Sequence, residues 1–213
     1  MVSIYLVGRD LDRLPVAAGQ FFHVRFLRRG GWWRPHPFSI SAAPNGAYLR
    51  LTIKDLGDDS HRMMTMSVGT PVFVEGPYGA FTPRVVEREH VVLLAGGVGV
   101  TPLRSIFEAL PRGRHRISFL YREGDARETV FRQELQSLAA WHGADVHFLE
   151  GHRGSCHMPV DPLSPECLRS TLPYIADADV LICGSRSFTE RVLASLRALR
   201  VPEDHIHAER FGY

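Results

Sequence analysis

A glycine-rich stretch, GGVGVTP at residues 96–102, lies between an apolar run at 91–95 and a helical pattern. Glycine lets the backbone pass close to a ligand, and the start of a helix presents unpaired N–H groups and a positive dipole end. Pro102 suits the first helical turn, and Thr101 suits the capping position before it. The stretch therefore predicts a site for a pyrophosphate, although such turns also occur for packing reasons alone. It lacks both the GxGxxG spacing and the GKS/T ending of common phosphate loops.

Two later turns occupy the ends of predicted strands, YREG at 121–124 and CGS at 183–185. In an open parallel sheet, ligands bind beyond the carboxyl ends of the strands. Arg122 is a candidate partner for an adenosine 2′-phosphate, and Arg186 is a second candidate. A solvated surface charge explains each arginine equally well. Taken alone, Cys183 is best interpreted as a small buried side chain without chemistry.

Polar residues are unusually dense at 36–41, HPFSIS, where a buried strand would carry branched and aromatic apolar residues. The alternative to a functional segment is a polar edge strand. Elsewhere, His152, Cys156 and His157 share a glycine-containing loop, but no fourth ligand or defined spacing accompanies them. We therefore predict no metal site.

The first half of the chain, up to about residue 85, reads as short strands separated by turn signals. The predicted strands are 3–7, 21–27, 48–53 and 71–75, and the one predicted helix is 60–66. Polar and apolar residues alternate over 48–53, which indicates a half-buried strand. This pattern favours a small antiparallel, Greek-key type β-barrel.

The second half alternates apolar strands with amphipathic helices, which is typical of a parallel sheet with covering helices. Strands are predicted at 91–95, 116–122, 145–149 and 180–184, and helices at 101–110, 129–141 and 188–200. Residues 82–90 form the predicted joint. We therefore expect a two-domain protein, with an antiparallel β-barrel at 1–85 and an α/β domain with a parallel sheet at 86–213.

The composition is that of an ordinary globular protein, with 213 residues and a formal net charge of +2. Lys54 is the only lysine and the arginines are scattered, which argues against nucleic-acid binding. No stretch approaches the roughly 20 apolar residues that a membrane-spanning helix needs, and no signal peptide is recognised. The three cysteines lack a disulfide or metal spacing, so a reducing, cytoplasmic compartment is the expectation.

Six segments occur in an order that resembles the ferredoxin-NADP reductase superfamily: HPFS, GPYGAF, AGGVGVTPLRS, YRE, a strand ending in CG, and ERFGY. The resemblance covers essentially the whole chain. HPFSISAAP and LTIKDLGDDS are most similar to the cytosolic dehydrogenase portion of bacterial ferric reductase-like membrane proteins, which are relatives of the NADPH oxidases. The resemblance implies FAD as cofactor and NADPH or NADH as electron donor.

For FAD, the resemblance implies that the polar strand faces the flavin. Phe38 would supply an aromatic ring and Ser39 a catalytic hydroxyl near N5, while the backbone of His36 and Pro37 follows the cofactor. The family usually has Arg and Tyr where this chain has His36 and Phe38, which removes a permanent positive charge near the pyrophosphate. The remaining implied contacts come from the next strand and the short helix after it: Thr52, Ile53, Lys54, Gly57, Asp59, Ser60 and His61.

For the nucleotide, the resemblance implies a dinucleotide lying across the carboxyl edge of the parallel sheet. Its pyrophosphate would rest on the glycine loop, its adenosine near Arg122, and its nicotinamide near Thr101 and Cys183. Phe211, with Tyr213 second, would cover the flavin, and Glu209 would lie near the nicotinamide. Ser185 replaces a proline of the family. The implied nucleotide-binding residues are Gly96, Gly97, Val98, Gly99, Thr101, Pro102, Tyr121, Arg122, Cys183, Gly184, Ser185 and Arg186.

The implied function is that of an FAD-dependent NAD(P)H dehydrogenase module. It would pass electrons to a b-type haem in a transmembrane domain, upstream in the same chain or in a partner chain, at the cytoplasmic face of a membrane. Ferric iron or oxygen would be the final acceptor. Two alternatives stay open: a free-standing flavin or ferredoxin reductase with a soluble acceptor, and a non-catalytic FAD or nucleotide sensor.

Overall fold

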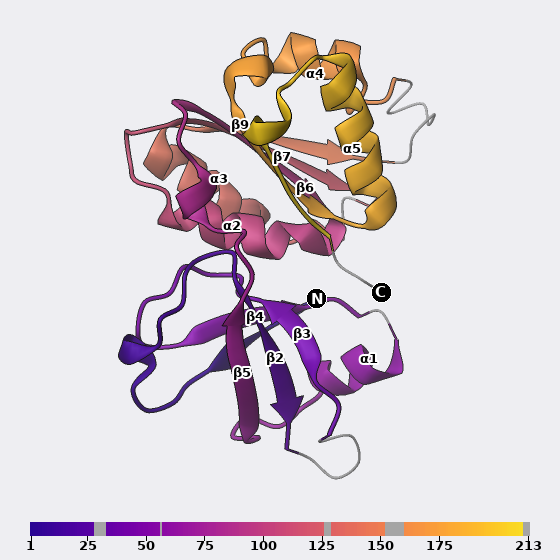
Figure 1. Cartoon of the computed structure of the whole chain (residues 1–213). Coiled ribbons are helices and arrows are strands. Elements are labelled where there is room, and N and C mark those ends of the chain that lie inside the picture. Colours follow the sequence, from indigo (N-terminus) through magenta and orange to yellow (C-terminus); the bar gives the residue numbers. More distant parts are fainter. Residues whose placement is uncertain (28–32, 56, 126–128, 152–159, 211–213) are drawn as a thin grey trace.

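The computed structural model of the chain describes residues 1–27, 33–55, 57–125, 129–151 and 160–210. The chain folds into two lobes, one above the other in Figure 1, with the first lobe built from residues before the joint and the second from residues after it. None of the helices in the described ranges combines the length and the apolar character needed to cross a membrane.

The first lobe is antiparallel, as predicted. In the described residues, β1 (Val2–Leu6) pairs with β4 (Leu49–Ile53), and β2 (Phe21–Phe26) lies between β3 (His36–Ser39) and β5 (Val72–Tyr78). A single bridge between Ile40 and Leu51 joins the two sheets. One apolar core fills the space between them, and α1 (Asp58–Met64) follows β4.

The second lobe contains the predicted parallel sheet, in the order β10-β9-β6-β7-β8. Its strands are β6 (His90–Gly96), β7 (Arg116–Glu123), β8 (Asp145–Glu150), β9 (Asp179–Gly184) and β10 (Ile206–Arg210). Helices α2 (Val100–Ala109) and α3 (Arg132–His142) pack on one face, and α4 (Pro165–Thr171) and α5 (Arg186–Ala198) pack on the other. Figure 1 shows α2 and α3 between this sheet and the first lobe.

Two elements were not expected from the sequence. Strand β10 pairs with β9 over its whole length, although its residues do not form an apolar run. It lies at the edge of the sheet, where only one side is paired and polar side chains are tolerated. Helix α4 begins at Pro165, with the Ser164 hydroxyl accepting a hydrogen bond from the Cys167 amide at 3.3 Å.

Strand β4 corrects one interpretation of the sequence. The alternation over 48–53 predicted a half-buried strand, but all five residues of β4 are buried. Arg50, on the polar face, has a side chain that is only 7% exposed, because it lies against α3 of the second lobe. The alternation is genuine, and at Arg50 the second lobe covers the face that it marks as polar.

The two lobes are packed together. Ala18 and Phe81, from the first lobe, are buried in the apolar cluster of the second lobe that surrounds α2. The Gly19 amide donates a hydrogen bond to the hydroxyl of Ser105 on α2 at 2.9 Å. At the joint, buried Asp179 accepts hydrogen bonds from the amides of residues 87 and 88 at 2.7 and 2.8 Å. Helix α2 therefore carries the first lobe on one of its sides.

Candidate functional site

The glycine stretch connects β6 directly to α2. A single 3-10 turn at Gly97–Gly99 leads into the helix, and the Val100 amide bonds to the carbonyls of Gly97 and Val98. The prediction that Thr101 caps the helix is wrong, because Gly99 is the capping residue and Thr101 lies inside the helix. The Thr101 hydroxyl instead donates to the Val98 carbonyl at 2.9 Å. The turn supplies the bonds that a cap would otherwise make, and no side chain caps the amides of the loop.

The three glycines are required for different reasons. A Cβ on Gly96 would lie 2.6 Å from the Phe188 ring, and one on Gly99 would lie 2.0 Å from the Cys183 carbonyl oxygen. Packing therefore accounts for both. Gly97 has a left-handed φ of +56°, and a Cβ there would meet only the Glu123 carboxylate, at 3.9 Å. The open space that a ligand phosphate needs is thus found at Gly97.

The arginines proposed for the adenosine end lie in different surroundings. Arg122 is half-buried, and its guanidinium donates to the carbonyls of Glu123 at 2.6 Å, Leu149 at 2.7 Å and Gly151. It thereby ties together the ends of β7 and β8. Arg186 is 81% exposed at the start of α5 and pairs with Glu190 at 2.8 Å. Tyr121 and Pro102 are buried, so only their backbone is available beside the loop.

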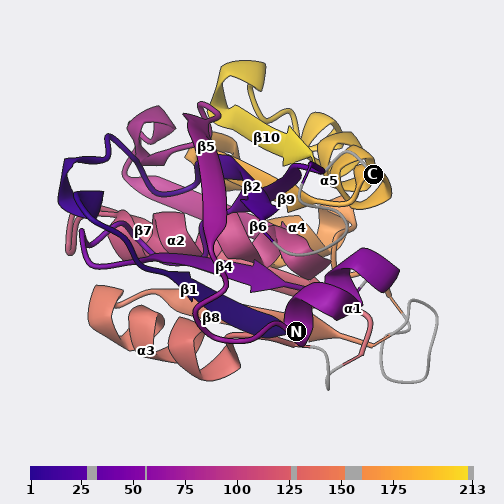
Figure 2. The same cartoon turned by 90° about the horizontal axis from the view of Figure 1, so that it is seen from below.

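Cys183 and Glu209 lie side by side on neighbouring strands, in register. Cys183 is fully buried toward α2, and burial, with the nearby Glu209 charge, raises the pKa of its thiol well above the ordinary value. Burial also raises the pKa of the Glu209 carboxyl. Glu209 Oε1 lies 3.8 Å from where a Cβ on Gly79 would be, so the end of β10 reaches the first lobe. In the view from below in Figure 2, β10 projects onto the same region as β2 and β5.

Ser39 lies near this meeting point. It is buried and pairs with Phe21 on β2, and the Phe21 ring lies 3.4 Å from the same Cβ position on Gly79. Phe21 thus adjoins residue 79 and pairs with residue 39 in the first lobe, while Glu209 approaches residue 79 from the second lobe.

The rest of the polar strand shows which atoms are available to a flavin. His36 is half-buried, Pro37 is exposed, and Phe38 is half-buried with its ring 6.4 Å from that of Phe26. On β4, the Thr52 hydroxyl lies 2.8 Å from the Ser41 hydroxyl, and Ile53 belongs to the core of the lobe. The side chains of Thr52 and Ile53 are therefore occupied within the lobe, which leaves only their backbone for a cofactor.

Helix α1 begins after Gly57, which has a φ of +147° and no capping side chain. The Ser60 hydroxyl donates to the Gly57 carbonyl at 2.8 Å, and His61 Nδ1 lies 3.0 Å from Asp55. The His61 hydrogen bond lowers the pKa of the Asp55 carboxyl. The uncapped amides at this end suit an anion. The Asp59 side chain lies outside what the structure describes.

Lys54 and Glu123 form a pair that the sequence did not indicate. Lys54 Nζ, at the end of β4, lies 3.6 Å from Glu123 Oε2, which is the carboxylate oxygen that faces Gly97. Glu123 is 8% exposed, and its other oxygen accepts from the Gly124 amide at 2.9 Å. Lys54, the only lysine of the chain, therefore reaches from the end of β4 in the first lobe to the end of β7 in the second, next to the glycine loop. That it is the only lysine was the one feature of the sequence that could have drawn attention to this pair.

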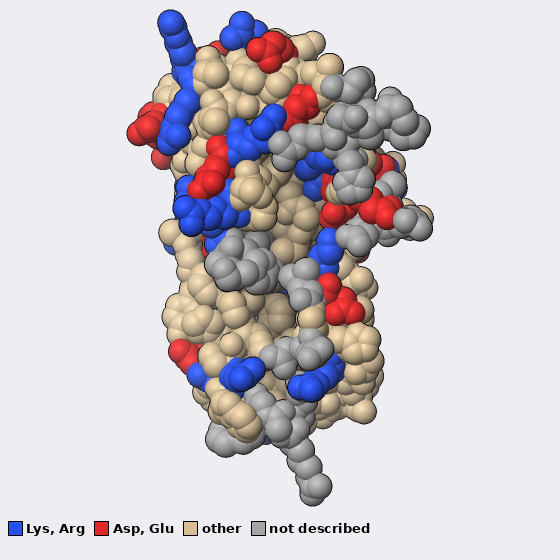
Figure 3. All heavy atoms as spheres, turned by 90° about the vertical axis from the view of Figure 1, so that its right-hand side faces the viewer, with Lys and Arg blue, Asp and Glu red and all other residues tan. Residues whose placement is uncertain are grey.

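Several predictions lie outside the described residues: those for Phe211 and Tyr213, and the loop residues His152, Cys156 and His157. In the described ranges, no group of three His, Cys, Asp or Glu side chains is placed to hold a metal ion. Figure 3 views the side of the molecule toward which the β6 and β7 arrows of Figure 1 point. On this side, charged side chains of both signs surround a hollow in the second lobe that is lined by uncharged residues, drawn in tan.

Both lobes match families of known domains. Residues 2–82 match the model of a family described as an FAD-binding domain, and residues 93–193 match that of the oxidoreductase NAD-binding domain. The crystal structure of the flavohem-like FAD/NAD-binding domain of nitric oxide dioxygenase from Vibrio cholerae superposes with a TM-score of 0.77. It is 27% identical, and the match covers 99% of this chain and 92% of that one.

Two longer relatives are similar over nearly all of this chain. A flavohemoprotein of Chromobacterium violaceum is 30% identical, over 100% of this chain and 57% of its own length. The ferredoxin reductase component of a Mycobacterium tuberculosis 3-ketosteroid-9-alpha-monooxygenase is 31% identical, over 93% of this chain and 56% of its own length. The chain thus spans just over half the length of each. With its FAD-binding domain followed by an NAD-binding domain, the chain belongs to the ferredoxin-NADP reductase superfamily of FAD-dependent NAD(P)H oxidoreductases.

Proposed function

We propose that the chain is the dehydrogenase module of an electron-transfer system, which takes hydride from NADPH or NADH and passes electrons to a haem-containing membrane domain. The observation that carries the proposal is the approach of Glu209, from the second lobe, to Gly79 of the first lobe, next to the Phe21–Ser39 pair of β2 and β3. Bound FAD supplies the chemistry, because it accepts a hydride and can release electrons singly. The protein's part is to bind, orient and exclude water.

Each residue in the site has a proposed task. Ser39 would place a hydroxyl beside the flavin N5, and the half-buried Phe38 ring would lie along the flavin. Gly97 admits the nucleotide pyrophosphate, and Lys54 provides a positive charge next to it. Glu209, the pKa of whose carboxyl is raised by burial, would lie near the nicotinamide.

Further proposed contacts lie at both ends of the site. The backbone at Cys183 and Gly184 would line the nicotinamide pocket, and Phe211, which lies outside the described residues, would cover the flavin until the nucleotide arrives. At the adenosine end, Arg122 and Arg186 are the proposed partners of a 2′-phosphate, which would favour NADPH. To engage it, Arg122 must exchange some of its three carbonyl contacts, so Arg122→Ala tests this part directly. The proposal predicts a larger loss of rate with NADPH than with NADH, and equal losses contradict it.

The acceptor separates two versions of the function. A haem partner is supported by the similarity to flavohemoproteins, whose name joins flavin and haem. A free-standing reductase with a soluble acceptor is supported comparably by the similarity to a ferredoxin reductase component. In the first version the module lies at the cytoplasmic face of a membrane and the haem is of the b type.

The deciding experiment is anaerobic mixing of the FAD-loaded protein with NADPH and, separately, NADH. Bleaching of the flavin absorption by either nucleotide supports the dehydrogenase. An unchanged spectrum in FAD-loaded protein refutes it and favours a sensor. Adding a haem protein or a ferredoxin to the reduced module then tells the two acceptor classes apart.

A further inference from the structure

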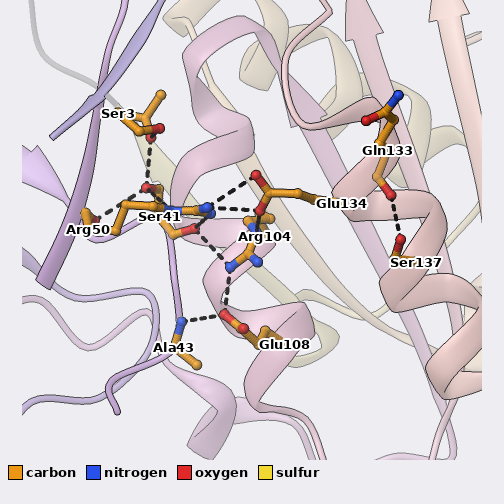
Figure 4. Close-up of polar contacts among 10 residues, drawn as sticks. Ser3, Ser41, Ala43, Arg50, Arg104, Glu108, Gln133, Glu134 and Ser137 are labelled. Carbon is orange, nitrogen blue, oxygen red and sulfur yellow. Dashed lines mark hydrogen bonds and ion pairs between the residues drawn. The ribbon is translucent and has the colours of Figure 1, made fainter. Parts of the chain in front are cut away.

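Four segments meet at the boundary between the lobes in a cluster of charged side chains, which we call the interlobe arginine cluster (Figure 4). The cluster consists of six residues from the turn after β3, from β4, from α2 and from α3: Ser41, Ala43, Arg50, Arg104, Glu108 and Glu134. Figure 4 shows the two arginines and the two glutamates pointing toward one another.

The Ser41 carbonyl is the centre of the cluster. It accepts hydrogen bonds from Arg104 Nη1 at 3.0 Å and from Arg50 Nη2. Arg50 Nε also donates to the Ser41 hydroxyl at 3.1 Å. One peptide of the first lobe is therefore held by an arginine from each lobe, and charge-assisted bonds of this kind are stronger and more directional than neutral ones.

The two glutamates complete the cluster. Arg50 Nη1 donates to both Glu134 oxygens, at 2.9 and 3.1 Å, and Arg104 Nε forms an ion pair with Glu134 at 2.8 Å. Arg104 Nη1 also donates to Glu108 at 2.5 Å, and Glu108 accepts from the Ala43 amide at 2.6 Å. Two positive and two negative charges thus balance.

Burial and backbone geometry indicate that this arrangement is closely specified. The side chains of Arg50 and Arg104 are only 7% and 8% exposed, so loss of a partner would leave a buried charge unpaired. Phe131, which precedes α3, has a left-handed φ of +59° that is uncommon for a bulky residue. Its ring lies 4.8 Å from the Arg50 guanidinium and 6.0 Å from that of Arg104. Strained residues of this kind persist where their surroundings over-determine them.

The cluster lies between the two halves of the proposed reaction. Ser41 is two residues beyond Ser39, whose hydroxyl is proposed to face the flavin. Arg104 is on α2, the helix that begins directly after the glycine loop proposed to hold the nucleotide. The cluster therefore links the segment after β3, proposed to face the flavin, to the glycine loop through helix α2.

We propose that Arg104, together with Arg50 and Glu134, is a positioning unit that sets the distance between the flavin and the nicotinamide. The proposal rests on the proposed function and deepens it, because these residues act through Ser41 and α2. Hydride transfer requires reacting atoms about 3 to 3.5 Å apart, and a misplacement of about 1 Å can cost about 100-fold in rate.

The test is Arg104→Met, which removes the charge and keeps most of the length. Arg116→Met is the matched control, because Arg116 also pairs with a glutamate, Glu89 at 3.1 Å, but is 75% exposed at the start of β7. We expect the hydride-transfer rate of FAD-loaded Arg104→Met, measured anaerobically, to fall about 100-fold. Affinity for FAD and for NADP⁺ should stay within threefold of wild type, and the control should keep the wild-type rate. A rate within threefold of wild type in Arg104→Met overturns the proposal.

A second measurement needs no cofactor. Residual dipolar couplings of the FAD-free protein report the relative orientation of the lobes, and we expect a changed orientation in Arg104→Met but not in Arg116→Met. If Arg104→Met does not fold, Glu134→Gln, at a residue that is 39% exposed, replaces it, with a smaller loss of rate in the same direction expected. If neither nucleotide reduces the wild type, the proposed function fails. The couplings then decide the positioning role alone, and an unchanged orientation overturns it.

Discussion

Gly97→Ala and Gly99→Ala should have opposite profiles, although both add one methyl group to the same turn. Gly97 adopts a φ of +56°, and the added methyl would meet only the Glu123 carboxylate, at 3.9 Å. The cost to folding is then the left-handed backbone alone, about 1–2 kcal/mol. The methyl would fill the space beside the loop amides where a phosphate must approach. We expect NADP⁺ binding to weaken at least about tenfold, which corresponds to 1.4 kcal/mol.

Gly99 has an ordinary helical φ of −59°, so alanine is not disfavoured by its backbone. Its methyl would lie 2.0 Å from the Cys183 carbonyl oxygen and 2.7 Å from the Gly184 amide nitrogen. Because such contacts are not found below 3.0 Å, the loop and the end of β9 must separate by about 1 Å. Overpacking of this kind costs about 1–3 kcal/mol, occasionally more. The loss in Gly99→Ala should therefore appear mainly in stability.

Urea unfolding followed by circular dichroism measures the first quantity, and titration of the FAD-loaded variants with NADP⁺ measures the second. The reasoning is refuted if Gly97→Ala binds NADP⁺ as tightly as wild type. It is also refuted if Gly99→Ala has the wild-type free energy of unfolding, because the contact with Cys183 would then carry no energetic weight.

Three further predictions concern single side chains. Burial lowers the pKa of His142, whose ring stacks on Phe107, below the ordinary 6.5. Below pH 6.5 the unfolded chain therefore takes up a proton at this histidine that the folded chain does not. The free energy of unfolding should then fall as the pH drops below 6.5. His142→Leu should reduce this fall in urea unfolding at pH 7.5 and 5.5, and an identical pH dependence would count against the assignment. Lys54→Gln removes the positive charge beside the Glu123 carboxylate and should weaken NADP⁺ binding about tenfold, or 1.4 kcal/mol. Glu123→Gln should not weaken it. Equal losses of affinity in the two titrations would exclude the lysine charge as the cause. Ser39→Ala should slow flavin reduction in stopped-flow about fivefold to tenfold, the effect of one hydrogen bond, with little change in FAD affinity, and an unchanged rate would end the proposed role.

The class of the fold and the family could be inferred from the amino-acid sequence alone. Buried parallel strands are read from continuous apolar runs such as residues 91–95 and 180–182, because both of their faces are covered by helices. The need for glycine at residue 97 is also a property of the local backbone, because only glycine readily adopts its left-handed conformation. The ordered motifs then pointed to FAD and NAD(P)H, and the matched domain families agree. Strand β10 was not predicted, because an edge strand with polar residues has no continuous apolar run.

The partners of the charged residues were decided only by the tertiary structure. Arg50 finds Glu134 84 residues away, and Arg104 finds the Ser41 carbonyl 63 residues away. In the sequence both arginines look like ordinary surface charges, since nothing within one helical turn or one strand pair marks them as buried. Glu108 alone follows Arg104 at helical spacing.

The same limit applies to the site itself. Sequence patterns report which face of a helix or strand is buried, because that depends on periodicity within one element. They do not report which element covers that face, because that depends on how separate elements pack. The glycine loop was therefore readable from the chain. The roles of Gly96 and Gly99 in packing emerged only from the contacts of the loop with β9 and α5 inside the second lobe. The pair of Lys54 with Glu123 and the approach of Glu209 to Gly79 emerged only when the two lobes came together.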